Sequence, residues 1–175
     1  VSVTDPSNTG TQAKGKQTFK RGGIWYTPQS GIWQTVWIEE VCEGYIESVK
    51  LTPDIDNDEI TVEVKYNGKP SDEMAAVVMD KGEVKGAVKL TDGKGTIKLS
   101  DYELWSPENP YLYDLKIAAG NDRVESYFGM RKYSVGKDAE GVSRLMLNNK
   151  PYFYNGLLDQ GYWSDGMYTA PSDEA

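Results

Sequence analysis

Hydrophobic and polar residues alternate along most of the middle of this chain. The clearest run has an apolar residue at every second position, namely Ile60, Val62, Val64 and Tyr66. The same pattern recurs at residues 84–90, 97–99 and 111–117, and a last strand is expected from about Val124 to Ser134. A period of two is typical of a β-strand that buries one face.

Residues that favour turns separate these runs. The separators are Asp56-Asn57-Asp58, Asn67-Gly68-Lys69-Pro70, Lys81-Gly82, Asp92-Gly93 and Gly120-Asn121-Asp122. Counted from Tyr45, the pattern predicts about seven short strands with no helical periodicity between them. This is typical of an all-β, antiparallel, immunoglobulin-like β-sandwich, and extra β segments are expected at both ends. The Cys-Trp-Cys signature of antibody domains is absent, so the prediction concerns architecture only.

The two ends of the chain differ from its middle. Residues 1–22 are polar, whereas residues 24–41 are rich in aromatic and β-branched side chains and predict a strand pair, 24–26 and 32–38. Residues 145–154 predict a tight hairpin around Asn149-Lys150. Residues 171–175 predict the start of a helix with Ser172 as its N-cap, and the chain is therefore expected to continue in a longer protein.

Composition excludes several classes of function. The net charge is −8, so the chain lacks the basic surface by which proteins bind nucleic acid, and no apolar run approaches the roughly 20 residues that span a membrane. There is no histidine, and the one cysteine, Cys42, forms no internal disulfide. This argues against a serine-histidine or cysteine-histidine catalytic centre, and we expect no metal and no cofactor. The free cysteine is compatible with cytoplasm or periplasm, with a periplasmic or secreted location slightly favoured.

Four stretches together resemble glycoside hydrolase family 2. They are Ser30-Gly31-Ile32-Trp33-Gln34-Thr35-Val36-Trp37-Ile38-Glu39, Leu104-Trp105-Ser106-Pro107-Glu108-Asn109-Pro110-Tyr111-Leu112-Tyr113, Tyr127-Phe128-Gly129-Met130-Arg131, and Leu147-Asn148-Asn149-Lys150-Pro151 leading to Asn155-Gly156-Leu157-Leu158-Asp159-Gln160-Gly161-Tyr162-Trp163. The resemblance implies three parts. Residues 1–41 would be the last strands of a sugar-binding jelly roll, residues 42–136 the sandwich, and residues 137–175 the linker, hairpin and first strand of a (β/α)8 barrel.

The resemblance also implies a retaining glycosidase as the parent enzyme. Retention needs two carboxylates about 5–5.5 Å apart, and the family's catalytic glutamates are expected beyond Ala175. Asp159 and Asp165 lie on a predicted loop without a buried scaffold to hold such a pair, so no catalytic residue is predicted in this chain. The sandwich is expected to orient its flanking domains, and the sugar that the parent cleaves is not determined by these residues.

The candidate site residues have two interpretations each. At the mouth of a complete barrel, Asp159 would hydrogen-bond a sugar hydroxyl and Trp163 would stack on a sugar ring; the alternative is packing of the barrel entry. Arg131 is either an interdomain contact that pairs with a carboxylate or a surface arginine on an edge strand. Trp25, Trp33 and Trp37 suggest a carbohydrate platform, but packing against a largely missing jelly roll is favoured.

Two other classes of protein fit the same sequence. One is a free-standing carbohydrate-binding module, which would bind sugar without hydrolysis. The other is an immunoglobulin-like interaction domain that pairs through an exposed edge strand. If the chain is instead a part of a glycosidase, residues 24–41 would lack their natural neighbours, and we expect self-association through them.

Overall fold

The structure is a computed structural model that describes residues 1–32, 35–68, 73–159, 163 and 170–175. The chain forms two compact units, and each is described by itself. Glu40–Asn155 form the first, here called the sandwich unit, and Val1–Glu39 with Gly156–Ala175 form the second, here called the terminal unit. Among the described residues, no helix is long and apolar enough to cross a membrane. The domain boundaries predicted at residues 41 and 136 stay a prediction.

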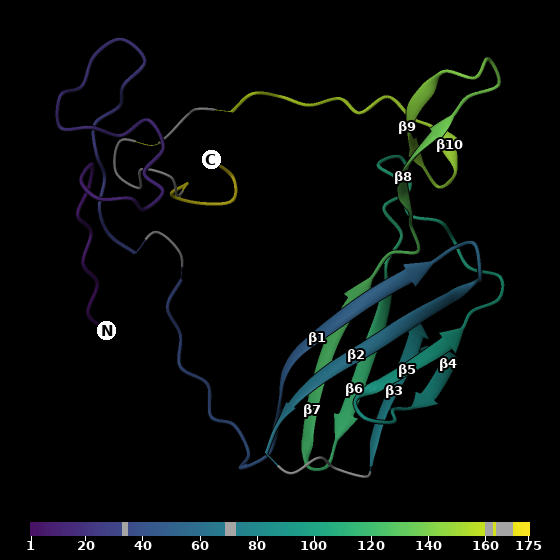
Figure 1. Cartoon of the computed structure of the whole chain (residues 1–175). Coiled ribbons are helices and arrows are strands. Elements are labelled where there is room, and N and C mark those ends of the chain that lie inside the picture. The colour runs from purple at the N-terminus through teal and green to yellow at the C-terminus, as the bar shows by residue number, and fades with distance from the viewer. Residues whose placement is uncertain (33–34, 69–72, 160–162, 164–169) are drawn as a thin grey trace. The chain divides into compact units, whose positions relative to one another are not determined.

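The described part of the sandwich unit is built from antiparallel strands only. They are β1 (Tyr45–Asp54), β2 (Glu59–Asn67), β3 (Met74–Asp80), β4 (Glu83–Lys89), β5 (Lys94–Lys98), β6 (Tyr113–Ala119), β7 (Asp122–Phe128), β8 (Tyr133–Lys137), β9 (Ser143–Leu147) and β10 (Lys150–Pro151). They form three sheets with the orders β1-β2-β5, β4-β3-β6-β7 and β10-β9-β8 (Figure 1).

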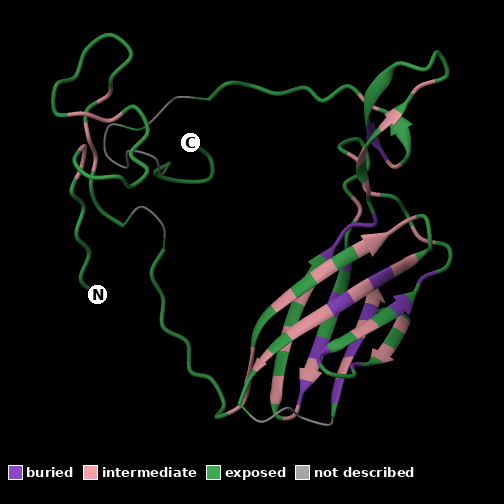
Figure 2. Cartoon of the chain, in the orientation of Figure 1, coloured by how far each residue is buried: buried purple, intermediate pink, exposed green. Residues whose placement is uncertain are grey.

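The sheets β1-β2-β5 and β4-β3-β6-β7 bury one hydrophobic core between them (Figure 2). Ile60 and Val62 of β2 and Leu115 of β6 are completely buried, and the polar residues between them point outward. Burial of each such side chain stabilises the folded state by about 1.5–3 kcal/mol. The apolar residues of the alternating pattern therefore face the core between the two sheets. The predicted all-β immunoglobulin-like sandwich is confirmed, with β1 to β7 as its strands.

The turn at Asp92-Gly93 shows why residues of this kind separate the strands. Gly93 has a φ of 75°, in the left-handed region that favours glycine. A Cβ atom there would collide with the carbonyl oxygen of Val64. The close approach allows the Val64 N–H to donate a hydrogen bond of 2.7 Å to the Gly93 carbonyl. The predicted turn is thus confirmed, and glycine is required on two counts.

The last strand of the sandwich ends earlier than the sequence predicts. The expected strand from Val124 to Ser134 is divided into β7, which ends at Phe128, and β8, which begins at Tyr133 in the third sheet. Between them, Met130 forms an isolated parallel bridge with Leu104. After this break β8 pairs with β9, and the sequence pattern does not say which strand is the partner.

The predicted hairpin near residue 149 is present, but its turn lies one residue earlier. Leu147 of β9 pairs with Lys150 of β10, so Asn148 and Asn149 form the two-residue turn. Their φ angles are 52° and 65°, as a type I′ turn requires, and asparagine tolerates this conformation better than most residues do. Lys150 would be a poor residue for the same position, which explains the shift.

The terminal unit contains no named strand among its described residues. The predicted pairing of residues 24–26 with residues 32–38 is wrong for the described part. Tyr26 donates its N–H to the Lys16 carbonyl at 2.9 Å and accepts the N–H of Thr18 at 3.1 Å. The backbone N–H and carbonyl of Tyr26 are therefore bonded to residues 16–18. Trp37 is 67% exposed and not part of a strand.

The predicted helix start at residues 171–175 is not a helix in the structure. Ser172 nevertheless makes the hydrogen bond of an N-cap, since its Oγ accepts the N–H of Ala175 at 3.3 Å. One such bond does not offset the cost of fixing the first helical turn, so these residues form no helix and the N-cap role of Ser172 stays a prediction.

Candidate functional site

The predicted sugar-contact residues lie at the surface. Asp159 is exposed, and Trp163 is 40% exposed, in the part of the terminal unit that the structure describes. Residues 160–162 between them, Asp165 and Trp33 lie outside the described residues. Sugar binding by Asp159 and Trp163 therefore stays a prediction. Within the described residues, no group of three acidic or cysteine side chains is arranged to hold a metal ion.

Arg131 lies between β7 and β8, so the alternative that placed it on an edge strand is wrong about the strand. Its guanidinium carbon is 4.5 Å from the centre of the Trp105 ring and 5.3 Å from that of Tyr133. Arg131 is exposed, where such cation–π contacts are worth about 0.5–1 kcal/mol. The predicted interdomain ion pair of Arg131 is not tested by these contacts and stays a prediction.

Gly129 explains why Trp105 and Arg131 meet. A Cβ atom on Gly129 would lie 2.9 Å from Trp105 Cβ and 3.0 Å from two atoms of its indole. The Trp105 N–H donates to the Met130 carbonyl at 2.9 Å and holds the two segments together. The sequence Phe128-Gly129-Met130-Arg131 therefore provides the surface on which Trp105 packs. Sequence reasoning noticed both motifs and missed that each is the partner of the other.

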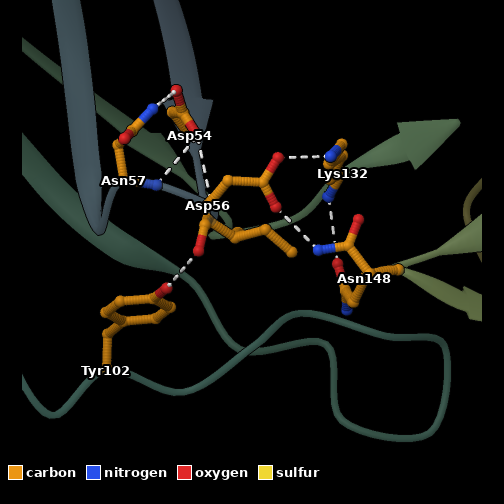
Figure 3. Close-up of polar contacts among 8 residues, drawn as sticks. Asp54, Asp56, Asn57, Tyr102, Lys132 and Asn148 are labelled. Carbon is orange, nitrogen blue, oxygen red and sulfur yellow. Dashed lines mark hydrogen bonds and ion pairs between the residues drawn. The ribbon is translucent and has the colours of Figure 1, made fainter.

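A polar cluster lies beside this stack and joins the sandwich to the third sheet (Figure 3). Asp56, in the turn between β1 and β2, accepts hydrogen bonds from Lys132 Nζ and from Asn149 Nδ2, the latter at 2.7 Å. These two donors hold the pKa of the Asp56 carboxyl below its usual value. A general acid needs the opposite shift, so Asp56 serves as an ionised structural anchor.

Asn148 connects the hairpin turn to the Trp105 segment. Its Oδ1 accepts the N–H of Lys132 at 3.0 Å, and its Nδ2 donates to the Trp105 carbonyl at 2.9 Å. Both polar ends of one side chain are thus used by backbone groups on two segments. Because a neutral hydrogen bond contributes about 0.5–1.5 kcal/mol, this side chain is a substantial part of the joint.

Tyr102 closes the other side of the same turn. Its hydroxyl donates to Asp58 Oδ1 at 2.7 Å. Burial, and then the hydrogen bond to Asp58, raise the pKa of Tyr102 to about 12. The sequence signalled a turn at Asp56-Asn57-Asp58 and a hairpin near Asn149, but nothing in it indicated that the two turns touch. These contacts form a joint between the sandwich and the third sheet.

Comparison with known proteins places the sandwich in a family. Residues 44–131, half of the chain, match the model of glycosyl hydrolases family 2. Comparison with curated proteins finds no match.

Among solved structures, a β-glucuronidase of Faecalibacterium prausnitzii is similar to 65% of this chain, with 28% identity and a TM-score of 0.55. A β-glucuronidase of Ruminococcus gnavus also covers 65% of the chain, with 19% identity and a TM-score of 0.55, a level of identity that shows the fold alone. The chain spans 18% and 19% of the lengths of these two proteins. The match over the whole sandwich, from β1 to Arg131, shows that this chain belongs to glycosyl hydrolases family 2.

Proposed function

We propose that this chain is a non-catalytic part of a longer retaining glycoside hydrolase, in which the sandwich orients the flanking domains. The observation that carries the proposal is the family match over residues 44–131, together with a chain about a fifth as long as its structural neighbours. Because both of these neighbours are β-glucuronidases, β-glucuronides are the first substrates to test.

The joint at the end of the sandwich supports an orienting role. Asp56 contacts Lys132 and Asn149, which lie 76 and 93 residues further along the chain. The third sheet that they fix presents an exposed apolar face that includes Tyr133, Val135 and Leu145, exposed by 54–72%. Exposed apolar surface of this kind is typical of an interface, and we assign it to the barrel of the longer protein.

The test compares this chain with the longer protein that contains it. Both are assayed against a panel of 4-nitrophenyl glycosides that includes the β-glucuronide. We expect no turnover by the 175 residues alone and turnover by the longer protein, with the first product retaining its anomeric configuration in proton NMR spectra. Turnover by the short chain would refute the non-catalytic role, and an inverted product would refute the mechanism.

A carbohydrate-binding module remains the second candidate because Trp25 and Trp37 are 48% and 67% exposed. Calorimetric titration of neutral oligosaccharides separates the two. Binding without turnover by both the chain and the longer protein would favour the module.

A further inference from the structure

A pocket of about 550 Å³ lies within residues 1–39 of the terminal unit. Its described lining includes the basic residues Lys14, Lys20 and Arg21 and the indole of Trp25, and it contains no acidic residue. Pockets of about 300–1,000 Å³ are of the size that holds small ligands. Three cations with no carboxylate among them favour an anion.

Local hydrogen bonds hold two walls of this pocket in place. Gly22 and Trp25 exchange backbone hydrogen bonds of 3.2 and 3.1 Å, and the φ angles of Gly22 and Gly23 are 139° and 60°. Arg21 and Trp25, on the two sides of this tight turn, both line the pocket. On the other wall, Lys14 Nζ donates to the Asn8 carbonyl at 2.8 Å, which fixes one positive charge.

The charge distribution along the chain sharpens the choice of ligand. Residues 1–38 contain four basic residues and one acidic residue, a net charge of +3, whereas the whole chain carries −8. The terminal unit also contains Glu39, Asp159, Asp165, Asp173 and Glu174, so its positive charge is confined to the segment that lines the pocket. A small anion can contact this segment alone, whereas a long polyanion such as nucleic acid would also meet the acidic residues.

We propose that this pocket binds an acidic sugar, a pyranose ring that carries a carboxylate. The carboxylate contacts the Lys20 and Arg21 side chains, and the apolar face of the ring packs on the Trp25 indole. Charge-assisted hydrogen bonds and aromatic stacking are the two interactions that such a ligand offers together. The choice of a sugar among anionic rings rests on the proposed function.

The test uses the 175-residue chain and two probes that differ only in the carboxylate. Methyl β-D-glucuronide and methyl β-D-glucoside are titrated by calorimetry, with the indole N–H signal of Trp25 followed in parallel by NMR. We expect the glucuronide to bind at least about tenfold more tightly, since one charge-assisted hydrogen bond is worth that much. Its affinity is expected to fall as ionic strength rises from about 0.01 M to about 0.15 M.

Variants locate the binding. The double substitution Lys20→Gln with Arg21→Gln is expected to weaken glucuronide binding about tenfold or more, and Trp25→Ala is expected to weaken binding of the ring. Lys150→Gln removes an exposed cation from the sandwich unit and is the matched control, with unchanged affinity expected. Circular dichroism spectra verify that each variant is folded.

Three results would overturn the proposal. They are equal affinity for the two probes, glucuronide binding that survives the double substitution, and binding of inorganic sulfate as tight as that of the glucuronide. The comparison of the two probes needs no variant. If the pocket does not bind the glucuronide, the glycosidase assay of the longer protein is unaffected. If the longer protein is inactive but the pocket binds the glucuronide, only the proposed function is refuted.

Discussion

The contact between Trp105 and Gly129 yields the sharpest prediction of stability. Substitution Gly129→Ala would place a methyl group 2.9–3.0 Å from three atoms of Trp105, closer than carbon atoms normally approach. Trp105 cannot move freely, because its own N–H and carbonyl are hydrogen-bonded to Met130 and Asn148. Overpacking of this kind typically costs about 1–3 kcal/mol, and we expect the free energy of unfolding to fall by that amount.

The control and the assay follow from the same geometry. Gly156→Ala adds a methyl group with no neighbour within 4 Å and should change the unfolding free energy by less than about 0.5 kcal/mol. Urea denaturation followed by circular dichroism measures both variants. Trp105→Ala removes the clash, so Gly129→Ala is expected to cost little in that background, and the double-mutant cycle isolates the contact. Equal costs of Gly129→Ala with and without Trp105 would refute the reasoning.

Three further predictions concern charge and association. Because the pKa of Asp56 is lowered in the folded state, its carboxylate stabilises the fold above the unfolded pKa of about 3.9, and this effect is lost as pH falls through the folded pKa. Urea midpoints measured from pH 6 to 2 should show this loss of stability. The loss should be smaller in Asp56→Asn. Because the pKa of Tyr102 is raised to about 12 in the folded state, its neutral hydroxyl stabilises the fold below the unfolded pKa of about 10, and this effect is lost as pH rises through about 12. In an alkaline titration followed by tyrosinate absorbance, Tyr102→Phe should lack one component that titrates late. We also propose that residues 24–41 mediate self-association, so sedimentation velocity should show dimers that Trp37→Ser weakens; a monomer at all concentrations would contradict this.

The sequence was sufficient to predict the sandwich because its core obeys a local rule. Ile60 and Val62, or Leu115 and Ile117, are two residues apart, and the burial of each follows from the same period. The turn residues between strands are equally local, since a left-handed φ depends on the residue itself. These features need no knowledge of which strands become neighbours.

The joint could not be predicted in the same way, because its contacts are distant in the chain. Asp56 and Lys132 are 76 residues apart, and no periodic pattern links a turn to a lysine between β7 and β8. The division of the expected strand 124–134 also depends on contacts that are distant in the chain, since an alternating pattern does not indicate where a strand changes its partner. Arg131 was recognised as a candidate, but its contact with Trp105 depends on Gly129 lying beneath the ring.

The polar cluster around Asp56 has a consequence for recombining the parts of such enzymes. Cutting the chain at residue 136 would retain Asp56 and Lys132 but remove Asn148 and Asn149, and with them the bonds to the Trp105 carbonyl and the Asp56 carboxylate. The smallest transplantable module is therefore residues 40–155, which carries its own hairpin. A chimera joined after Asn155 would inherit the native angle between sandwich and hairpin, whereas one joined at 136 would leave that angle to be set by its new neighbour.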